Sequence, residues 1–385
     1  MEDYKKGILM APGELFLKSE GVKKIFKRKL VSNLSFFLKR EKVGFAIESF
    51  RGRIFVRTEA IGKAQKAIKN CFGISWFAPC FKAGKEDLKG FSRLVQEESL
   101  KEIKKEQTFA IRIRLEKGLV KEGREKVINK LAKGINRKVD LDHPDKEVFV
   151  EIRKKGWFLF FKKKKGVGGL PVGSSGKGAV LVSGGIDSPV AAFLAVKRGL
   201  ENVWIHFHSF PLVSKSSIEK VKESAGVFLK YQPHLKIYFV PFQKIQLKIK
   251  TSASPKYRVL FYRRFMIKIA QKIASKENCQ ALVTGESLGQ VSSQTLSNMN
   301  ITQEAAKGLA LRPLVGMDKE EIISLAKKIK TYNISIKPQE DCCTLFVPKG
   351  QTAKGDLKEI KEIEKNLDQG KLIEEALREI EVEFI

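Results

Sequence analysis

The sequence predicts a multidomain α/β protein in which two small α+β units precede a doubly wound parallel sheet. Three observations support this prediction. The chain has 385 residues, which is too long for one ordinary core. Up to about residue 165, alternating strand patterns mix with helical patterns, as they do in α+β units. After the glycine-rich stretch that follows, strand and helix patterns alternate, which is typical of a parallel sheet with helices on both faces.

Residues 1–58 are predicted to form the first domain, a small α+β unit with an antiparallel sheet. Its one helix is expected at residues 22–39 and carries many basic side chains. The other expected elements are a strand at residues 7–10, a turn at 11–14, and strands at 45–49 and 53–57.

Residues 59–165 are predicted to form a second α+β domain. The expected helices are 62–70, 86–105 and 121–136, and the expected strands are 108–115, 147–153 and 157–161. Many of its side chains are basic, and a solvated face and an RNA-binding face explain them equally well. These residues are Lys101, Lys104, Lys105, Arg112, Arg114, Lys121, Arg124, Lys126 and Lys130.

Lys162 to Gly178 is rich in Gly, Ser and Lys and is predicted to be a linker, so the catalytic domain is assigned to residues 166–385. A helical closing element is expected at residues 356–385. Within the domain, strands are expected at 179–183, 203–208, 237–241 and 281–284, and helices at 189–198 and 257–276.

The charge of the chain indicates a polyanionic partner. Lys and Arg total 74 against 43 Asp and Glu, which gives a net charge of +31. Nucleic acid is the leading candidate, with a membrane surface or the lysine enrichment of heat-adapted proteins as alternatives. Heat adaptation normally raises Glu together with Lys, and here the excess is one-sided. The sequence has no apolar run of eighteen residues and no signal-peptide core, so we expect a cytoplasmic protein.

The five cysteines suit a reducing compartment. They form neither an even disulfide ladder nor a CxxC pair, which makes a structural zinc site an unattractive explanation. Only the adjacent Cys342 and Cys343 call for a chemical role, the alternative being two small buried apolar side chains.

The most specific motif is the segment Leu181-Val-Ser-Gly-Gly-Ile-Asp-Ser-Pro189, between a predicted strand and a predicted helix. Gly184 and Gly185 would let backbone N–H groups approach an anion, and the helix amino terminus would add its positive dipole end. Ser188 is expected as the helix cap, with Pro189 at the first position. Ser183 and Ser188 would donate to phosphate oxygens, and Asp187 would hold Mg²⁺ or shape the loop.

This loop is neither a Walker loop nor the dinucleotide fingerprint. It resembles the PP-loop of ATP pyrophosphatases, which split ATP to AMP and pyrophosphate; the alternative is a glycine turn that only connects strand to helix. Several synthetases and tRNA-modifying ligases share such a loop. It therefore indicates the energy source without identifying the product.

Further segments resemble the ThiI family of tRNA 4-thiouridine synthetases over almost the whole chain. They are Gly13-Glu-Leu-Phe-Leu-Lys18, Cys71-Phe-Gly-Ile74, Gly168-Gly-Leu-Pro-Val-Gly173, His206-Phe-His208, Arg263-Arg264, Gly285-Glu-Ser-Leu-Gly-Gln-Val-Ser-Ser-Gln-Thr-Leu296, Arg312-Pro-Leu314 and Asp318-Lys319.

The resemblance implies a ferredoxin-like α+β domain, a tRNA-binding THUMP α+β domain and a PP-loop ATP pyrophosphatase domain. It also implies an ATP site lined by the loop together with Leu181, Val182, His206, Phe207, Arg263, Gly285 and Gln294. Taken alone, His206 suits a core position and Arg263 an ordinary helix charge. For Lys319, a surface position and a catalytic role remain equally open.

The family pattern further implies that uracil O4 of tRNA uridine 8 is adenylated and that sulfur then displaces AMP. Glu340-Asp-Cys-Cys-Thr344 matches the family segment that bears an essential cysteine, which aligns with Cys342; Cys343 is the nearest resolving thiol. A cysteine desulfurase is the expected persulfide donor, and a homodimer is the expected assembly. An iron–sulfur cofactor is not favoured, because three well-spaced thiolates are missing near Cys342.

Some relatives carry a carboxy-terminal rhodanese-like domain that accepts the sulfur, but this chain ends about forty residues after Cys343. We therefore expect sulfur to reach the catalytic-domain cysteines directly or through a carrier, and we do not expect a role in thiamine thiazole synthesis. Two other functions compete: a different PP-loop tRNA ligase, and a tRNA-binding module with a vestigial ATP site.

Overall fold

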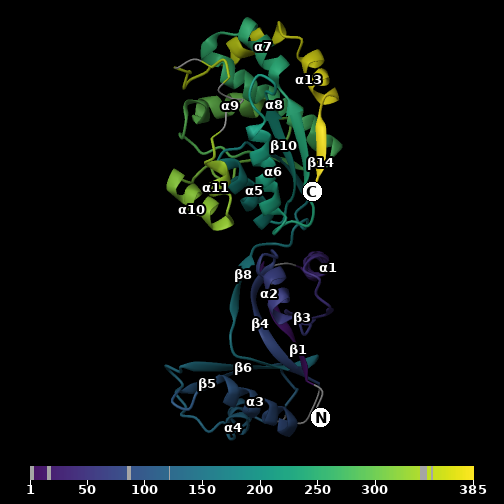
Figure 1. Cartoon of the computed structure of the whole chain (residues 1–385), viewed down its shortest axis with the longest axis vertical. Coiled ribbons are helices and arrows are strands. Elements are labelled where there is room, and N and C mark those ends of the chain that lie inside the picture. The colour runs from purple at the N-terminus through teal and green to yellow at the C-terminus, as the bar shows by residue number, and fades with distance from the viewer. Residues whose placement is uncertain (1–3, 15–18, 85–87, 121, 339–344, 348–349) are drawn as a thin grey trace. The chain divides into compact units, whose positions relative to one another are not determined.

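In the computed structural model the chain separates after Pro171 into two units, Met1–Pro171 and Val172–Ile385, which are considered in turn (Figure 1). The structure describes residues 4–14, 19–84, 88–120, 122–338, 345–347 and 350–385. None of the helices in these ranges has the length and apolar character needed to cross a membrane.

The first unit is built on an eight-stranded sheet of order β2-β3-β1-β4-β7-β6-β5, with β8 also pairing with β4. Its pairings are antiparallel except for β5 with β6, which run parallel. The strands are β1 Lys5–Pro12, β2 Ala46–Phe50, β3 Arg53–Arg57, β4 Ile74–Ala83, β5 Phe109–Leu115, β6 Lys146–Arg153, β7 Gly156–Phe160 and β8 Lys164–Gly168.

Two helix pairs give this sheet two cores. Helices α1 (Glu20–Arg40) and α2 (Ile61–Lys69) pack with Ile8 and Met10 of β1, and α3 (Leu88–Glu102) and α4 (Arg124–Ala132) pack with β5 and β6. Because side chains alternate along a strand, Leu9 of β1 faces the other side, where it joins Phe55, Phe158 and Phe160. One face of the sheet therefore carries an aromatic cluster.

Two features of the first unit differ from the sequence prediction: the structure of the predicted linker and the position of the first domain boundary. Lys164–Gly168 forms β8 against the amino half of β4, so part of the predicted linker is a strand. The sequence lacks a strand pattern there, and the strand forms because an edge of β4 offers unpaired backbone groups. Strand β4 was not predicted either. It shares the core of β1 with α2, so residues 61–77 pack with the first predicted domain.

The second unit contains a six-stranded sheet of order β13-β12-β9-β10-β11-β14. The first five strands are parallel, which confirms the predicted doubly wound sheet, and β14 pairs antiparallel with β11. The closing element, which was predicted to be helical over residues 356–385, consists of the two helices α12 and α13 followed by strand β14. The strands are β9 Lys177–Leu181, β10 Glu201–His208, β11 Lys236–Pro241, β12 Ala281–Val283, β13 Leu309–Leu311 and β14 Glu381–Phe384.

Helices cover both faces of this sheet, as the alternation along β10 shows. Val203 and Ile205 pack in the core that includes α8, whereas Trp204 meets Phe228 of α6 on the opposite face. The helices are α5 Asp187–Lys197, α6 Ser216–Phe228, α7 Gln243–Ser252, α8 Arg258–Lys276, α9 Leu296–Glu304, α10 Lys319–Ile329, α11 Tyr332–Ser335, α12 Leu357–Lys365 and α13 Gln369–Arg378. Loops after β9, β10, β12 and β13 therefore meet at one edge of the sheet, where ligands bind in such folds.

Candidate functional site

The loop between β9 and α5 is held by its own two serines. Ser188 Oγ donates to the Ser183 carbonyl at 3.1 Å and accepts from the Ser183 N–H at 2.9 Å. The N–H of Gly185 points to Ser183 Oγ at 3.3 Å. Helix α5 begins at Asp187, and its N-cap Ile186 makes no side-chain cap, so the predicted capping role of Ser188 is wrong. The hydroxyl of Ser188 reaches back across the loop instead.

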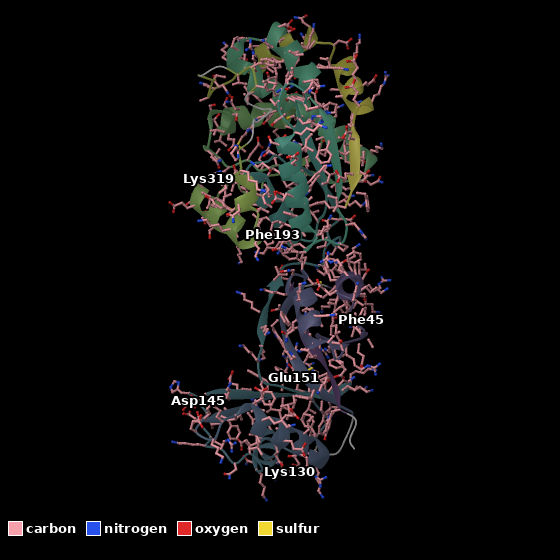
Figure 2. All side chains as sticks on the ribbon, in the orientation of Figure 1. Phe45, Lys130, Asp145, Glu151, Phe193 and Lys319 are labelled. Carbon is pink, nitrogen blue, oxygen red and sulfur yellow. The ribbon has the colours of Figure 1, made fainter. Side chains whose placement is uncertain are left out.

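Asp187 opens helix α5 and binds two side chains from distant segments. Lys319 Nζ lies 2.6 Å from Asp187 Oδ1, and Gln290 Nε2 donates to Oδ2 at 3.0 Å. Lys319 is placed by a capping box at the start of α10, in which Asp318 and Glu321 bond each other's backbone N–H. Figure 2 shows Lys319 in this position. The structure thus brings together two of the residues that were predicted to be catalytic.

Gly285 allows the loop after β12 to contact the start of α5. A Cβ at this position would lie 2.9 Å from both the Cα and the backbone N of Ser188, which is closer than real Cβ atoms come. Gln294, whose backbone carbonyl accepts from the Gly289 N–H, also accepts the Ser287 N–H on its side-chain oxygen at 3.2 Å. The loop that spans residues 285–294 is therefore folded onto itself and packed against the phosphate-loop helix.

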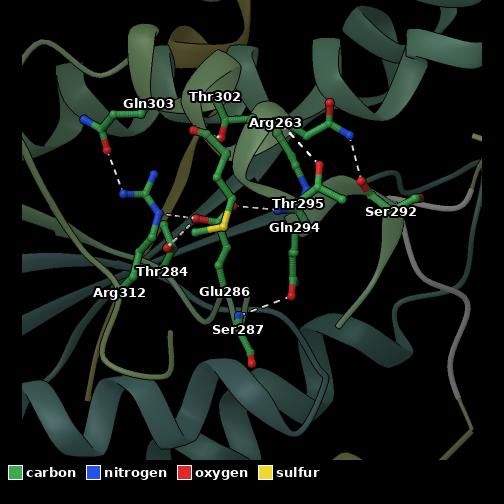
Figure 3. A network of polar contacts seen from close by, with 12 residues as sticks. Arg263, Thr284, Glu286, Ser287, Ser292, Gln294, Thr295, Thr302, Gln303 and Arg312 are labelled. Carbon is green, nitrogen blue, oxygen red and sulfur yellow. Dashed lines mark hydrogen bonds and ion pairs between the residues drawn. The ribbon is translucent and has the colours of Figure 1, made fainter. Parts of the chain in front are cut away.

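Arg263 reaches the same loop from α8. Its Nη1 donates to Glu286 Oε1 at 2.6 Å, and Arg312, which follows β13, donates through Nε to Glu286 Oε2 at 2.8 Å. Figure 3 shows Glu286 between the two guanidinium groups. Arg263 is therefore no isolated helix charge, since it belongs to a polar network at the carboxyl edge of the sheet.

His206 and Phe207, at the end of β10, have buried side chains. His206 contacts the Val182 carbonyl through Nδ1 at 2.9 Å and Ser217 Oγ through Nε2 at 3.1 Å. Burial lowers the pKa of His206 to about 4, so its ring is neutral at pH 7. Phe207 packs edge-on against Phe242. His206 thus contacts the first residue after β9, and Leu181, the last residue of β9, packs against the core that contains Phe207.

Comparisons with known proteins match each part of the chain to a family model. Residues 173–369 match the thiamine biosynthesis protein ThiI, residues 7–78 match the ThiI ferredoxin-like domain, and residues 86–162 match the THUMP domain. A probable tRNA sulfurtransferase of Caldanaerobacter subterraneus subsp. tengcongensis is 38% identical over 379 residues, which cover 97% of this chain and 98% of that protein. The chain belongs to the ThiI family.

Two further proteins are similar to this chain. A probable tRNA sulfurtransferase of Moorella thermoacetica is 46% identical over 246 residues, which cover 64% of this chain and 63% of that protein. The crystal structure of a 4-thiouridine synthetase–RNA complex with bound ATP superimposes with a TM-score of 0.89 at 32% identity, and the match covers 99% of this chain and all of that one. The predicted combination of ferredoxin-like, THUMP and PP-loop domains is confirmed.

The cysteines that the ThiI resemblance singles out, Cys342 and Cys343, lie outside the described residues. The described chain on the amino-terminal side is bonded to the phosphate loop, where Ser335 Oγ donates to the Gly185 carbonyl at 3.2 Å. On the carboxy-terminal side, Tyr262 of α8 donates its hydroxyl to the Leu345 carbonyl at 3.1 Å. Both flanks are therefore attached to elements that bear predicted site residues.

The cysteines that the structure describes are poor nucleophiles. Cys71 and Cys80 are buried and Cys279 is partly buried. Burial raises the pKa of Cys71 to about 12 and that of Cys279 to about 11, and it also raises the pKa of Cys80. Among the described thiols, none is expected to be a thiolate at neutral pH.

The first unit contains a strongly basic cavity of about 540 Å³. Arg53 and Arg153 extend from the strands to its wall, and both are bound by the buried carboxylate of Glu151, which Figure 2 labels. The lining residues are Arg51, Gly52, Arg53, Arg114, Leu115, Glu116, Lys117 and Arg153. Such a wall attracts polyanions, because five cationic side chains face one acidic one.

The sequence analysis missed several residues that the structure places in the site. Glu286 and Gln290 lie inside the segment that resembles the family, and Arg312 begins another such segment, but none was given a role. Ser335 had no signal, since a single serine on a short helix is ordinary. The sequence could have indicated Glu286, Gln290 and Arg312 only through the segments that contain them. The role of all four residues becomes visible in their contacts with distant segments.

Proposed function

We propose that this chain uses ATP to activate uridine 8 of tRNA and replaces its 4-oxygen with sulfur. The observation that carries the proposal is that the start of the PP-loop helix contacts both the Gly285 loop and, through Asp187, Lys319. These contacts occur in a chain that matches a 4-thiouridine synthetase over 99% of its length. That relative is described with RNA and bound ATP.

The phosphates of ATP are assigned to the loop after β9. Backbone N–H groups at Gly184 and Gly185 and the amino terminus of α5 would bind phosphoryl oxygens. Leu181, Val182, His206, Phe207, Gly285 and Gln294 are assigned to the nucleotide site. Ser183 and Ser188 shape the loop through their mutual bonds. The single O–H of Ser188 donates to the Ser183 carbonyl, so of these two hydroxyls Ser183 is the one that can donate to a phosphate oxygen.

A divalent cation fits this donor set. Asp187 is partly exposed, and its two oxygens accept one bond each from Lys319 and Gln290, which leaves lone pairs free. Mg²⁺ in nucleotide sites is held by one or two carboxylates, substrate phosphates and water. Asp187 would hold it, and the ion would neutralise charge on the phosphates when bound. Lys319 fixes the Asp187 carboxylate and adds a positive charge beside it.

The first chemical step is attack of uracil O4 on the α-phosphorus of ATP, which forms a P–O bond and expels pyrophosphate. This step converts a poor leaving group at C4 into AMP. Negative charge develops on the phosphoryl oxygens, and Lys319, Arg263 and the loop N–H groups are the groups that would stabilise it. Their positions are fixed before reaction by the contacts described above.

In the second step the terminal sulfur of a persulfide on Cys342 attacks C4, and AMP leaves with the C4–O bond electrons. The thiolate of Cys343 then attacks Cys342, which breaks the S–S bond to the transferred sulfur and leaves a disulfide and 4-thiouridine. A cysteine desulfurase supplies the persulfide. The described cysteines support this assignment by elimination, since burial raises the pKa of each.

The first unit is assigned to tRNA binding. Its basic cavity and the net charge of +31 suit a phosphate backbone. The proposal keeps three domains, with the first boundary after residue 77 and the last after Pro171, and it includes a homodimeric assembly and a cytoplasmic location.

The test is mass spectrometry of nucleosides from unmodified tRNA incubated with the protein, Mg-ATP, a cysteine desulfurase and cysteine. Wild type is expected to yield 4-thiouridine, whereas Asp187→Ala and Cys342→Ala yield none. Pyrophosphate release without a thiolated base in the wild type would refute the sulfur route. Absence of both products with a competent donor would favour a tRNA-binding module.

A further inference from the structure

The two carboxylate oxygens of Glu286 have different partners. Glu286 follows Gly285 directly, and its side chain is 9% exposed. Its Oε2 accepts from Arg312 Nε at 2.8 Å and from Thr284 Oγ1 at 3.0 Å. Its Oε1 accepts from Arg263 Nη1 at 2.6 Å. One oxygen thus fixes the carboxylate, and the other holds Arg263.

Arg312 is itself held in place. Its Nη1 donates to Gln303 Oε1 at 2.7 Å, and its side chain is 15% exposed. The contacts run from Gln303 of α9 through Arg312 and Glu286 to Arg263 of α8, as Figure 3 shows. Gln303, Arg312 and Glu286 thus fix the position of Arg263. Among the three charged side chains Arg263, Glu286 and Arg312, which we call the ion cluster, Arg263 is the most exposed.

The cluster keeps a positive charge. One carboxylate between two guanidinium groups neutralises only one of them. Within the described part of the chain, the side chain of Arg263 makes no hydrogen bond or ion pair other than the one from Nη1 to Glu286. A guanidinium has five N–H donors, so most of those on Arg263 are left for an anion.

We propose that Glu286 is the residue that positions Arg263 for the phosphates of ATP, with Arg312 holding Glu286 in place. The proposal rests on the ATP-dependent function given above. A long, flexible arginine loses rotamer freedom when it binds an anion, and a fixed carboxylate oxygen removes that cost in advance. Glu286 acts through Arg263 and does not touch the nucleotide.

The competing explanation is an ion pair that only ties α8 to the loop after β12. The chain offers a matched control, because the next residue of α8, Arg264, is also paired with a buried carboxylate. Arg264 donates through Nε and Nη2 to Glu364 at 2.8 and 2.7 Å. Glu364→Gln therefore removes a comparable ion pair on the same helix, away from the predicted site.

The experiment measures the Kd of ATP for the full chain by calorimetry, together with the midpoint of thermal unfolding. Glu286→Gln is expected to weaken ATP binding roughly tenfold to a hundredfold, as loss of a charge-assisted contact does. Glu364→Gln is expected to lower the unfolding midpoint and leave the Kd unchanged. Arg263→Ala and the double variant Glu286→Gln/Arg263→Ala complete a double-mutant cycle.

Positioning through Arg263 requires that Glu286→Gln has no further effect once Arg263 is Ala. Equal Kd values for wild type and Glu286→Gln, or additive effects in the cycle, would overturn the proposal. Arg312→Gln gives a second test if Glu286→Gln fails to fold, and its effect must also vanish in the Arg263→Ala background. ATP binding without 4-thiouridine would refute the proposed function while leaving the comparison of Kd values valid.

Discussion

Lys319 and Asp187, 132 residues apart in the chain, form an ion pair of 2.6 Å at the start of two helices, α10 and α5. The pair joins the phosphate loop to the segment that follows β13. The pair holds the Lys319 ammonium group beside the phosphate loop, and its side chains remain partly exposed, at 43% for Lys319 and 22% for Asp187.

Replacing Lys319 is expected to lower the rate more than it weakens ATP binding. Lys319→Met removes a positive charge next to developing phosphoryl charge, and we expect kcat for tRNA-dependent pyrophosphate release to fall roughly 10²- to 10³-fold. Lys328→Met, an exposed change on the same helix, is the control. A kcat within a factor of about two of wild type would show that Lys319 is a surface residue after all.

A methyl group at Gly285 is expected to disrupt the nucleotide site. In Gly285→Ala the new Cβ would be placed 2.9 Å from backbone atoms of Ser188, so the loop and α5 must separate. We expect loss of measurable ATP binding and a destabilisation of about 1–3 kcal/mol, measured by calorimetry and by chemical unfolding. Gly316→Ala is the matched control, because its Cβ would meet no atom within 4 Å. Normal ATP binding by Gly285→Ala would exclude the close contact.

His206 should make the second unit lose stability in acid. Burial lowers its pKa to about 4, whereas an unfolded histidine titrates near pH 6.5. The unfolded state therefore binds the proton first, and the contribution of His206 is complete above pH 6.5 and lost as the pH falls towards 4. The loss amounts to about 3 kcal/mol.

Hydrogen exchange of β10 amides, measured at pH 7 and pH 5 and corrected for intrinsic rates, reports the part of this free energy that is lost between these two pH values, about 2 kcal/mol. His206→Gln should remove the part of the pH dependence that belongs to His206, and His143→Gln, an exposed change in the first unit, should not. An unchanged slope in His206→Gln would contradict burial of a neutral ring.

Thiol labelling should distinguish the described cysteines from Cys342. Burial raises the pKa of Cys71, Cys80 and Cys279, so iodoacetamide at pH 7.5 is expected to leave these three unmodified in the folded protein. Labelling of Cys342 should then abolish 4-thiouridine formation while pyrophosphate release continues. Cys279→Ser should retain both activities, and a thiolation defect in that variant would place the sulfur carrier elsewhere.

The sequence predicted the elements whose signals are local. The strand, glycine loop and helix of residues 179–198 and the helix α8 follow from alternation, turn residues and periodicity. Strand β8, with the sequence KKGVG, has no such pattern, whereas Glu381–Phe384 alternates polar and apolar residues but was assigned to a helical closing element. Both strands form because a neighbouring strand, β4 or β11, offers an unpaired edge.

The residues of the candidate site also divide into those with a local sequence signal and those recognised only by contacts with distant segments. Asp187, Gly185 and Ser188 are recognisable because a phosphate loop needs them at a fixed spacing. The partners Glu286 and Arg312 belong to segments that meet only after the sheet has formed, and their pairing has no spacing rule. Arg263 looks like any helix arginine until Glu286 is placed beside it.

Strand β4 belongs to both halves of the first unit. One edge pairs with β1 along nearly its whole length, and the other pairs with β8 and then with β7, which carries the sheet on towards β5. A cut anywhere near residues 74–83 would leave one half with an open edge and an unfilled core. We therefore expect the ferredoxin-like and THUMP parts of this chain to unfold together, and a protein that carries one part without the other would have to supply a substitute strand.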